Sequence, residues 1–375
     1  ISLLYEQLNK IYQSIINAEE IGKLANTTSL EDKTEDESLG ALLMLLNQMY
    51  ANTPYSYTLK STRDSLKLFS DNMSYLTVKP QEKEYIAQGK IINTGVRNDS
   101  SNSGKNYYGF DIGTNSYKTI TNTSGALGTI EYGLDNNTSI GVAIGGNNQD
   151  INFKGSTKVD ASSIYLGVFG KTEKDNFKFS SGIGYQYTSA NAERTVYNGY
   201  DLFKASEKYN LNSFNMFIEG KYSYDMGDNL KAEPKIKLNY YYVLQDKIDE
   251  GYDKKNVTMK VNKISANTVD TEVGIDFIKS KVLEKGKLKG VVSLGVVNVL
   301  GNNNKNLKGQ IKGENKDGTT FELQGVELPR TSGKVGLNLE YEKINGTIYT
   351  AGIDFELAKD YNRNISLQVG VGYRF

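Results

Sequence analysis

The 375-residue chain contains no cysteine and no histidine. The absence of cysteine excludes disulfides, thiolate chemistry and cysteine-bound metals. The absence of histidine excludes Ser-His-Asp and Cys-His catalysis and removes the commonest ligand of transition metals. A phosphate-binding GxxxxGK[ST] loop is missing as well. We therefore expect no catalytic residue, no metal site and no cofactor, and we predict that the chain is not an enzyme.

The chain also has no excess charge and no long apolar run. Its 44 Lys and Arg residues balance 44 Asp and Glu residues, so no net charge favours nucleic acid. The longest apolar run, Leu39 to Leu46, falls far short of the roughly 20 residues of a membrane-spanning helix. Transmembrane β-strands are not excluded, because alternating residues hide their hydrophobicity from averaged hydropathy. Without a start methionine or a signal peptide, the sequence is expected to be a fragment of a longer precursor.

Residues 1–78 have the periodicity of helices. In the first helix the apolar residues recur at spacings of four and three, which places them on one face. These residues are Leu4, Leu8, Ile11, Ile15 and Ala18. The polar, acidic stretch 26–38 predicts a solvated linker. A second apolar stripe follows Pro54, and the opposite face of that helix carries Lys60, Arg63, Asp64 and Lys67.

From about residue 84 onward the period of the apolar residues changes to two. All odd-numbered residues from Ile365 to Phe375 are apolar, and the even-numbered residues between them are small or polar. This stretch matches the roughly 9–11 residues of a tilted strand that crosses a bilayer. In the earlier strands charge keeps to one face, as expected if the other meets lipid, where a mid-bilayer lysine costs about 2–4 kcal/mol. The charged residues predicted to face the interior are Glu131, Glu219, Lys235, Lys237, Asp270, Glu272, Asp276, Lys334, Glu340, Asp354, Glu356 and Arg374.

The connections between the predicted strands alternate between short and long. The short turns lie near 135–138, 172–176, 225–229, 281–286 and 343–346. The long polar connections lie near 98–122, 147–160, 190–211, 245–263 and 300–330, with a shorter one at 359–363. Periplasmic turns and external loops of outer-membrane barrels alternate in this way. With 85–97 as the first strand and 106–114 as an external hairpin, the connections join twelve strands. The first and the last strand then both have their free chain ends on the periplasmic side.

A twelve-stranded barrel leaves an interior that one helix, about 10–12 Å across, can occupy. We therefore predict an all-β membrane protein. Its parts are a helical linker at 1–38, a helical segment at 39–78 that threads the pore, and a twelve-stranded antiparallel transmembrane β-barrel at 84–375. Arg63 is expected deep in the pore beside a carboxylate. The candidate partners are Glu131, Glu219, Glu272, Asp354 and Glu356.

Three segments together resemble the translocator domain of classical monomeric autotransporters, which belong to type V secretion. They are the helical LNQMYANTPYSYTLKSTRDSLKLF (46–69), the glycine-rich SGALGTIEYGLDNNTSIGVAIGGNNQ (124–149) and the terminal VGVGYRF (369–375). The composition, with only 6 Arg among 44 basic residues, is most similar to the large fusobacterial autotransporter adhesins.

The resemblance implies a protein-transport function in the bacterial outer membrane, where the barrel enables export and surface anchoring of an upstream passenger, here an adhesin. Residues 1–38 would then lead from the passenger side. The implied partners are outer-membrane lipids, the barrel assembly machinery, periplasmic chaperones and the passenger itself, with no nucleic acid and with the barrel a monomer. The assembly machinery would read the terminal strand through Leu367, Val369, Val371, Tyr373 and Phe375. Some relatives cleave themselves at an Asn-Asn bond in the pore helix; residues 1–105 contain no such pair, so the passenger is expected to stay attached.

Two alternatives remain open from the residues alone. One is an outer-membrane diffusion porin or substrate-specific channel, which requires the first 80 residues to lie outside the lumen. The other is a soluble β-sandwich adhesin module with a helical stalk. Smaller features have structural explanations: Asp135-Asn136-Asn137 predicts a turn rather than a calcium site. The abundant tyrosines are expected in girdles at the lipid interfaces, with Tyr222, Tyr224, Tyr240, Tyr241 and Tyr242 as candidates.

Overall fold

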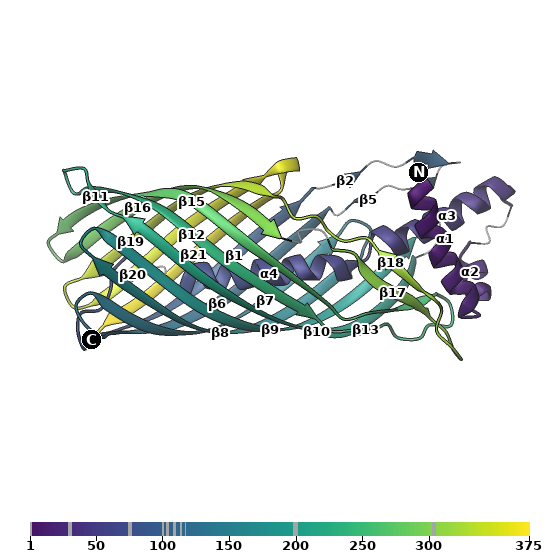
Figure 1. Cartoon of the computed structure of the whole chain (residues 1–375), viewed down its shortest axis with the longest axis horizontal. Helices are drawn as coiled ribbons and strands as arrows, with labels where there is room; N and C mark the ends of the chain where they lie inside the picture. Colours follow the sequence, from purple (N-terminus) through teal and green to yellow (C-terminus); the bar gives the residue numbers. More distant parts are fainter. Residues whose placement is uncertain are drawn as a thin grey trace.

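The computed structural model describes residues 2–28, 32–73, 77–99, 118–197, 202–301 and 305–375, with four short strand segments between residues 101 and 116. A long barrel of tilted strands encloses one helix, and three further helices lie beyond one end of the barrel (Figure 1). The helices are α1 (Ser2–Asn17), α2 (Ile21–Thr28), α3 (Glu35–Ala51) and α4 (Pro54–Met73). Within the described residues, no helix is both long and apolar enough to cross a membrane.

Twelve antiparallel strands form the barrel wall. They are β1 (Tyr85–Asn98), β6 (Thr119–Gly133), β7 (Thr138–Phe153), β8 (Lys158–Lys174), β9 (Phe177–Tyr197), β10 (Leu202–Tyr222), β12 (Leu230–Gln245), β15 (Ile264–Leu283), β16 (Gly286–Gly301), β19 (Thr331–Lys343), β20 (Thr347–Ala358) and β21 (Arg363–Arg374). Each strand pairs with its neighbours in chain order, β10 pairs with β12, and β1 pairs with β21, so the sheet is closed. The predicted twelve-stranded antiparallel barrel with a preceding helical segment is confirmed.

The remaining strands are short and lie outside the barrel wall or at its rim. They are β2 (Ser101–Asn102), β3 (Lys105–Tyr107), β4 (Phe110–Ile112), β5 (Asn115–Ser116), β11 (Tyr224–Asp225), β13 (Ile248–Asp249), β14 (Thr258–Val261), β17 (Leu307–Lys312) and β18 (Thr320–Leu323), with a 3-10 turn, η1, at Lys359–Tyr361. In the segment predicted to be an external hairpin, β2 pairs with β5 and β3 with β4. Residues 108–109 and 113–114 of that segment lie outside the described part.

The barrel closes between its first and last strands. The Tyr85 amide donates to the Phe375 carbonyl at 2.8 Å, and the Phe375 amide donates to the Tyr85 carbonyl at 2.9 Å. Their rings stack with centroids 5.4 Å apart. Closure leaves no unpaired strand edge facing lipid, where each unsatisfied backbone group would cost several kcal/mol.

Side-chain exposure follows the period of two. In β21 the side chains of Leu367 and Val369 are 51% and 60% exposed, whereas Gln368 between them is 1% exposed. The outer surface is therefore apolar and the inner surface polar, as a barrel in lipid requires. The short turns and Phe375 lie together at the end of the barrel that the sequence predicts to be periplasmic, and the opposite end is the predicted external one.

Two of the predicted external loops differ from expectation. In 147–160 the strands β7 and β8 stay paired as far as Asn152 and Lys158. In 190–211, β9 and β10 stay paired as far as Tyr197 and Leu202. Beyond the bilayer both faces of a strand meet water or protein, so the apolar alternation ends although the backbone pairing continues. A change in side-chain pattern was thus mistaken for the end of the strands.

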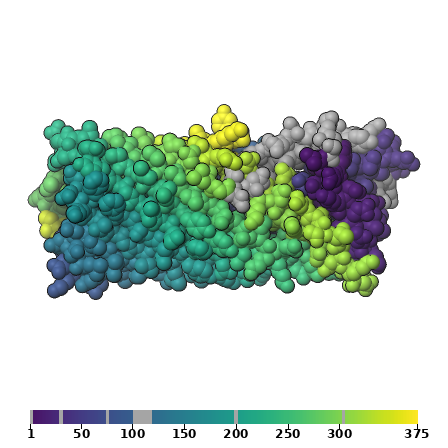
Figure 2. Space-filling view, in the orientation of Figure 1, coloured from purple at the N-terminus to yellow at the C-terminus, as the bar shows by residue number. Residues whose placement is uncertain are grey.

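Helices α1–α3 and the external connections form a cap over the outer mouth of the barrel. A four-stranded sheet, in the order β13-β14-β17-β18, supplies Ile311, Phe321 and Leu323. These residues belong to one buried cluster with Leu8 and Ile15 of the predicted apolar stripe. Figure 2 shows the N-terminal helices, in purple, packed against the yellow-green region of β17 and β18.

The predicted boundary between the linker at 1–38 and the pore segment at 39–78 differs from the structure. The helix that enters the lumen, α4, begins at Pro54 rather than at residue 39. Helix α2 continues to Thr28, and α3 begins at Glu35 behind a capping box, in which the Thr34 hydroxyl accepts from the Glu37 amide and the Glu37 carboxylate accepts from the Thr34 amide. Helix α3 packs in the cap against α1 and β18 rather than in the lumen. This packing explains why α3 is apolar on nearly all sides, because different sides of the helix contact α1 and β18.

Candidate functional site

Helix α4 lies in the barrel lumen, against the inner faces of β6 to β10 and β12 (Figure 1). Glycines of the wall make room for its largest side chains. A Cβ atom added at Gly167 would lie 2.4 Å from Met73 Sδ, and one added at Gly145 would lie 2.8 Å from Phe69. The Phe69 ring stacks on Tyr165 with centroids 4.8 Å apart. Gly145 of the glycine-rich segment and Gly167 of β8 therefore leave the space that the helix side chains occupy.

Amides of the wall bind the small polar residues of α4. Gln186 donates to the Thr62 carbonyl at 3.1 Å and accepts from the Ser65 hydroxyl at 2.7 Å. Asn147 also donates to the Ser65 hydroxyl, at 2.8 Å. Asn215 donates to Ser70 at 2.8 Å, one turn nearer the periplasm. These contacts place α4 in a specific rotation and height in the pore, which a purely apolar contact would not specify.

Arg63 is the most strongly held residue of the helix. Its side chain, 8% exposed, forms a salt bridge with Asp270 and donates from Nε to the Thr268 hydroxyl at 3.0 Å. The guanidinium also lies 4.7 Å from the ring centroid of Tyr241. The predicted partners Glu131, Glu219, Glu272, Asp354 and Glu356 do not form this pair. Strand tilt brings Asp270 of β15 to the height of Arg63, and sequence spacing does not reveal that offset.

Tyr241 does not belong to the aromatic girdle for which it was predicted. It is 1% exposed and points into the lumen, whereas Tyr240 and Tyr242 contact Phe214 on the outer face. The period of two in β12 explains the difference, since consecutive residues cannot share one face. Tyr222 and Tyr224 do contact each other, with centroids 4.5 Å apart, beside the periplasmic turn of β11 and β12.

The other charges of the helix form short pairs along its axis. Lys60 and Asp64 lie 2.6 Å apart, and Lys67 and Asp71 lie 2.8 Å apart, both at a spacing of four residues. Asp71 also accepts from Lys237 of β12 at 3.0 Å. Lys60, Arg63, Asp64 and Lys67 thus lie on neighbouring turns of the helix. The ion pairs between the helix and the wall are made by Arg63 with Asp270 and by Asp71 with Lys237.

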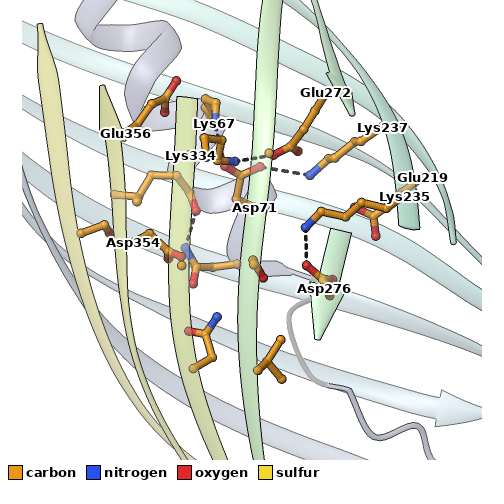
Figure 3. Close-up of a pocket in the computed structure, with 18 of the residues that line it drawn as sticks. Lys67, Asp71, Glu219, Lys235, Lys237, Glu272, Asp276, Lys334, Asp354 and Glu356 are labelled. Atoms are coloured by element: carbon orange, nitrogen blue, oxygen red, sulfur yellow. Dashed lines mark hydrogen bonds and ion pairs between the residues drawn. The ribbon is translucent and has the colours of Figure 1, made fainter. Parts of the chain in front are cut away.

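A charged cavity of about 290 Å³ separates α4 from the opposite side of the barrel. Figure 3 shows Lys67 and Asp71 projecting from the helix toward charged side chains of the wall. Nine of the predicted interior charges line this cavity: Glu219, Lys235, Lys237, Glu272, Asp276, Lys334, Glu340, Asp354 and Glu356. Asp276 pairs with Lys235 at 2.8 Å, and Glu272 pairs with Lys334 at 2.9 Å. Opposite charges alternate around the wall, so the lumen stays polar without a net field of one sign.

The remaining predicted charges lie elsewhere on the inner face. Glu131 pairs with Lys171 at 3.2 Å, Asp270 pairs with Arg63, and Arg374 pairs with Glu342 and Glu84 at the periplasmic rim. Sequence analysis missed Lys171 and Lys221, which pair with Glu131 and Asp276. The alternation of β9 predicts the inward face for Lys178, which pairs with Glu233. The alternation of each strand indicates the inward position of these lysines, because each lies an even number of residues from buried residues of the same strand.

A second buried ion pair holds the cap to the pore and was also missed. Arg194 of β9 and Glu250 of the external connection are 1% and 0% exposed. They are joined by two hydrogen bonds of 2.8 and 2.9 Å, and the Tyr55 hydroxyl at the start of α4 donates to the same carboxylate. No local pattern marks Glu250, because its partners come from distant parts of the chain.

The C-terminal residues predicted to direct assembly lie on the outer face of β21. All five are exposed: Leu367, Val369, Val371, Tyr373 and Phe375. Tyr373 and Phe375 stack with centroids 6.1 Å apart, and Phe375 also stacks on Tyr85 across the closing seam. This strand therefore presents an apolar, aromatic surface at the end where the barrel closes.

The family model of the autotransporter β-domain matches residues 94–354 of this chain. The chain belongs to the autotransporter β-domain family. A closed barrel with a helix in its lumen agrees with that match, and it makes the chain an outer-membrane translocator domain, as predicted from the sequence. A search of curated proteins found no match.

Two solved autotransporter barrels share the fold of this translocator domain. The translocator domain of the autotransporter NalP from Neisseria meningitidis is 16% identical, with a TM-score of 0.61, over 88% of this chain and 99% of that one. The β-domain of the Bordetella autotransporter BrkA is 11% identical, with a TM-score of 0.55, over 78% of this chain and 99% of that one. At these identities the likeness concerns the fold rather than individual residues.

Proposed function

We propose that this translocator domain exports a passenger joined to its N-terminal side and anchors that passenger at the cell surface. The path of the chain supports the proposal. It runs from the external cap through the lumen as α4 and reaches the periplasmic rim, where Lys79 donates to the Asn136 carbonyl at 2.7 Å in the turn between β6 and β7. Only then does β1 begin. A segment N-terminal to the pore helix is therefore held outside while the barrel remains in the membrane.

The finer parts of the proposal rest on the family resemblance. The passenger is an adhesin, and it stays attached because residues 1–105 contain no Asn-Asn pair. The barrel is a monomer inserted by the barrel assembly machinery with the help of periplasmic chaperones. The domain has no enzymatic activity of its own, because export draws on folding of the passenger rather than on nucleotide hydrolysis.

The helix in the lumen disfavours a diffusion porin. Such a channel needs an open bore, whereas α4 occupies the lumen here with Leu66, Phe69 and Met73 buried against the wall. The remaining cavity of about 290 Å³ is lined by charged side chains that pair with one another, such as Asp276 with Lys235. Conductance of the full chain and of a version lacking residues 1–78 would distinguish the two functions, because a porin would conduct equally in both forms.

An epitope tag joined before Ile1 tests the surface location of the passenger side. The tag should be cleaved by protease added to intact cells. As a control, the same tag inserted into the periplasmic turn at 344–346 should be protected until the outer membrane is permeabilised. Protection of the N-terminal tag in intact cells would contradict the proposal.

A further inference from the structure

The periplasmic rim of the barrel is divided into an aromatic part and a lysine-rich part. The aromatic part includes Tyr85, Tyr132, Tyr373 and Phe375 on one side of the barrel and Phe177, Tyr222 and Tyr224 on another. The lysine-rich part lies on the neighbouring hairpins β15–β16 and β19–β20. We define it as the lysine rim, made of Lys279, Lys281, Lys285 and Lys343.

The lysine rim lies at the height expected of lipid phosphates. On β15 the outward positions run through Ile275 and Phe277 and continue, two residues at a time, with Lys279 and Lys281. On β19 the outward Tyr341 is followed two residues later by Lys343. Lys279 and Lys343 each come directly after the last aromatic residue on the lipid-facing side of their strand, and the exposed apolar residues Val282, Leu283 and Ile344 lie beside the lysines at the two turns. In a bilayer this boundary is where hydrocarbon gives way to headgroups.

The hairpin geometry brings these lysines together. Lys343 lies opposite Gly286 in the pairing of β16 with β19. The Ile344 amide donates to the Lys285 carbonyl at 3.0 Å, which joins the tips of the two hairpins. Gly290, on the same outward face between Lys279 and Leu339, leaves a gap in the surface beside Lys279. The four lysines therefore lie on two adjoining hairpin ends.

The charges of the lysine rim are unbalanced, unlike those of the lumen. Within the described residues no carboxylate oxygen lies within 4 Å of the four ammonium groups, whereas lumen lysines such as Lys235 and Lys334 have carboxylate partners. Among the described residues, the ammonium groups of the rim lysines make one hydrogen bond, from Lys279 to the Asp228 carbonyl. Lys279, Lys281 and Lys285 are exposed. Such a patch attracts anionic lipid headgroups, by about 1 kcal/mol per lysine near the surface.

We propose that the lysine rim binds the phosphate of an anionic phospholipid in the periplasmic leaflet, with the acyl chains against the outer faces of β15, β16 and β19. The aromatic part of the rim presents mainly rings, and its exposed lysines Lys83, Lys174 and Lys231 lie on three separate segments of the chain. The site would therefore hold one anionic lipid at a fixed side of the barrel rather than a uniform shell.

Native mass spectrometry of the full chain in detergent tests the site, with phosphatidylglycerol and phosphatidylcholine of identical acyl chains as probes. The wild-type chain should retain phosphatidylglycerol at least tenfold better. The variant with Lys279→Gln, Lys281→Gln and Lys343→Gln should lose this preference, at about fivefold per lysine. The matched control replaces Lys254, Lys255 and Lys308 by Gln, which removes the same charge at the external end and should leave the preference unchanged.

Three results would overturn the proposal. Equal retention of both lipids by the wild-type chain would show that no anionic site exists. Equal losses in the two triple variants would show that net charge alone is measured. Displacement of phosphatidylglycerol by millimolar inorganic phosphate would indicate a free anion site rather than a lipid site. Heat-modifiable gel mobility establishes that each variant is folded, and Lys281→Gln alone replaces the triple variant if that variant fails to fold.

Discussion

Arg63 of the pore helix forms a salt bridge with Asp270 of the barrel wall, and both side chains are less than 10% exposed. The pair is separated by more than 200 residues in the sequence, yet it is the principal ionic contact of the middle of α4 with β15. A buried guanidinium requires such a partner, since removing one member leaves an uncompensated charge that costs about 3–5 kcal/mol.

The first prediction concerns this pair. Arg63→Ala should loosen the helix and cause intermittent openings in single-channel recordings, and Asp270→Asn should do the same. Removing residues 1–78 should raise conductance sharply and permanently. The double variant should be no leakier than the worse single variant, because the two residues act as one unit. Equal conductance with and without the helix would show that α4 does not close the pore.

The second prediction concerns the terminal strand. Deleting Phe375 should severely reduce the amount of assembled barrel in the outer membrane, because its backbone pairs with Tyr85 and its ring stacks on the same residue. Outer-membrane fractions are compared by heat-modifiable mobility and immunoblotting. Ile344→Ser is a suitable control, since this exposed periplasmic residue lies outside the closing seam. Unchanged levels of the deletion under high expression would contradict an assembly function of Phe375.

The third prediction concerns the fit of helix and wall. Gly167→Ala should destabilise the plugged barrel by about 1–3 kcal/mol, because the new Cβ atom would overlap Met73 and Tyr165. Gly89→Ala provides the control: no atom lies within 4 Å of its added Cβ, and a change within about 0.5 kcal/mol is expected. The midpoint of the heat-induced mobility shift measures both. If the two variants unfold together, α4 does not fill the space beside Gly167.

The fourth prediction concerns the cap. Glu250→Ala leaves Arg194 buried without its carboxylate, at a cost of about 3–5 kcal/mol. Trypsin should then cleave at Lys254 and Lys255 on intact cells, while the barrel keeps its heat-modifiable mobility. Asp249→Asn, which disrupts the more exposed pair with Lys312, should change cleavage little, because exposed pairs contribute about 0–1 kcal/mol. Similar cleavage in both variants would show that the buried pair does not hold the cap.

The fifth prediction concerns pH at the periplasmic rim. The Gln81 amide donates to the Glu84 carboxylate, which also pairs with Arg374, and these contacts lower the pKa of Glu84 below its usual 4.5. A lowered pKa in the folded state means that the stabilisation is present above pH 4.5 and is lost as the pH falls through the folded value. Glu84→Gln should therefore lower the mobility-shift midpoint slightly at pH 7 and by less at pH 3. An equal effect at both pH values would exclude an ionic contribution of Glu84.

The sequence by itself determined the architecture of the wall and the face of each strand residue. The period of two in residues such as Leu367 and Val369 is a local property, because consecutive side chains of a strand point to opposite faces whatever their partners are. The same holds for the interior position of Asp276 or Lys334, and for the apolar stripe of α1. Alternating turn lengths then predicted the strand number, since a barrel whose first and last strands both have their free chain ends in the periplasm requires an even count.

Only the tertiary structure decided which residues meet. Asp270 rather than Glu272 faces Arg63 because strand tilt and stagger set the height of each residue in the pore, and neither quantity appears in a strand's own pattern. Helix α3 joined the cap because helix α1 and the external strand β18 supplied a packing surface that its own sequence does not reveal. The Arg194–Glu250 pair likewise depends on a folded external connection. Periodicity is local and can be read along the chain, whereas pairing across a closed barrel depends on the register of strands that are far apart in sequence.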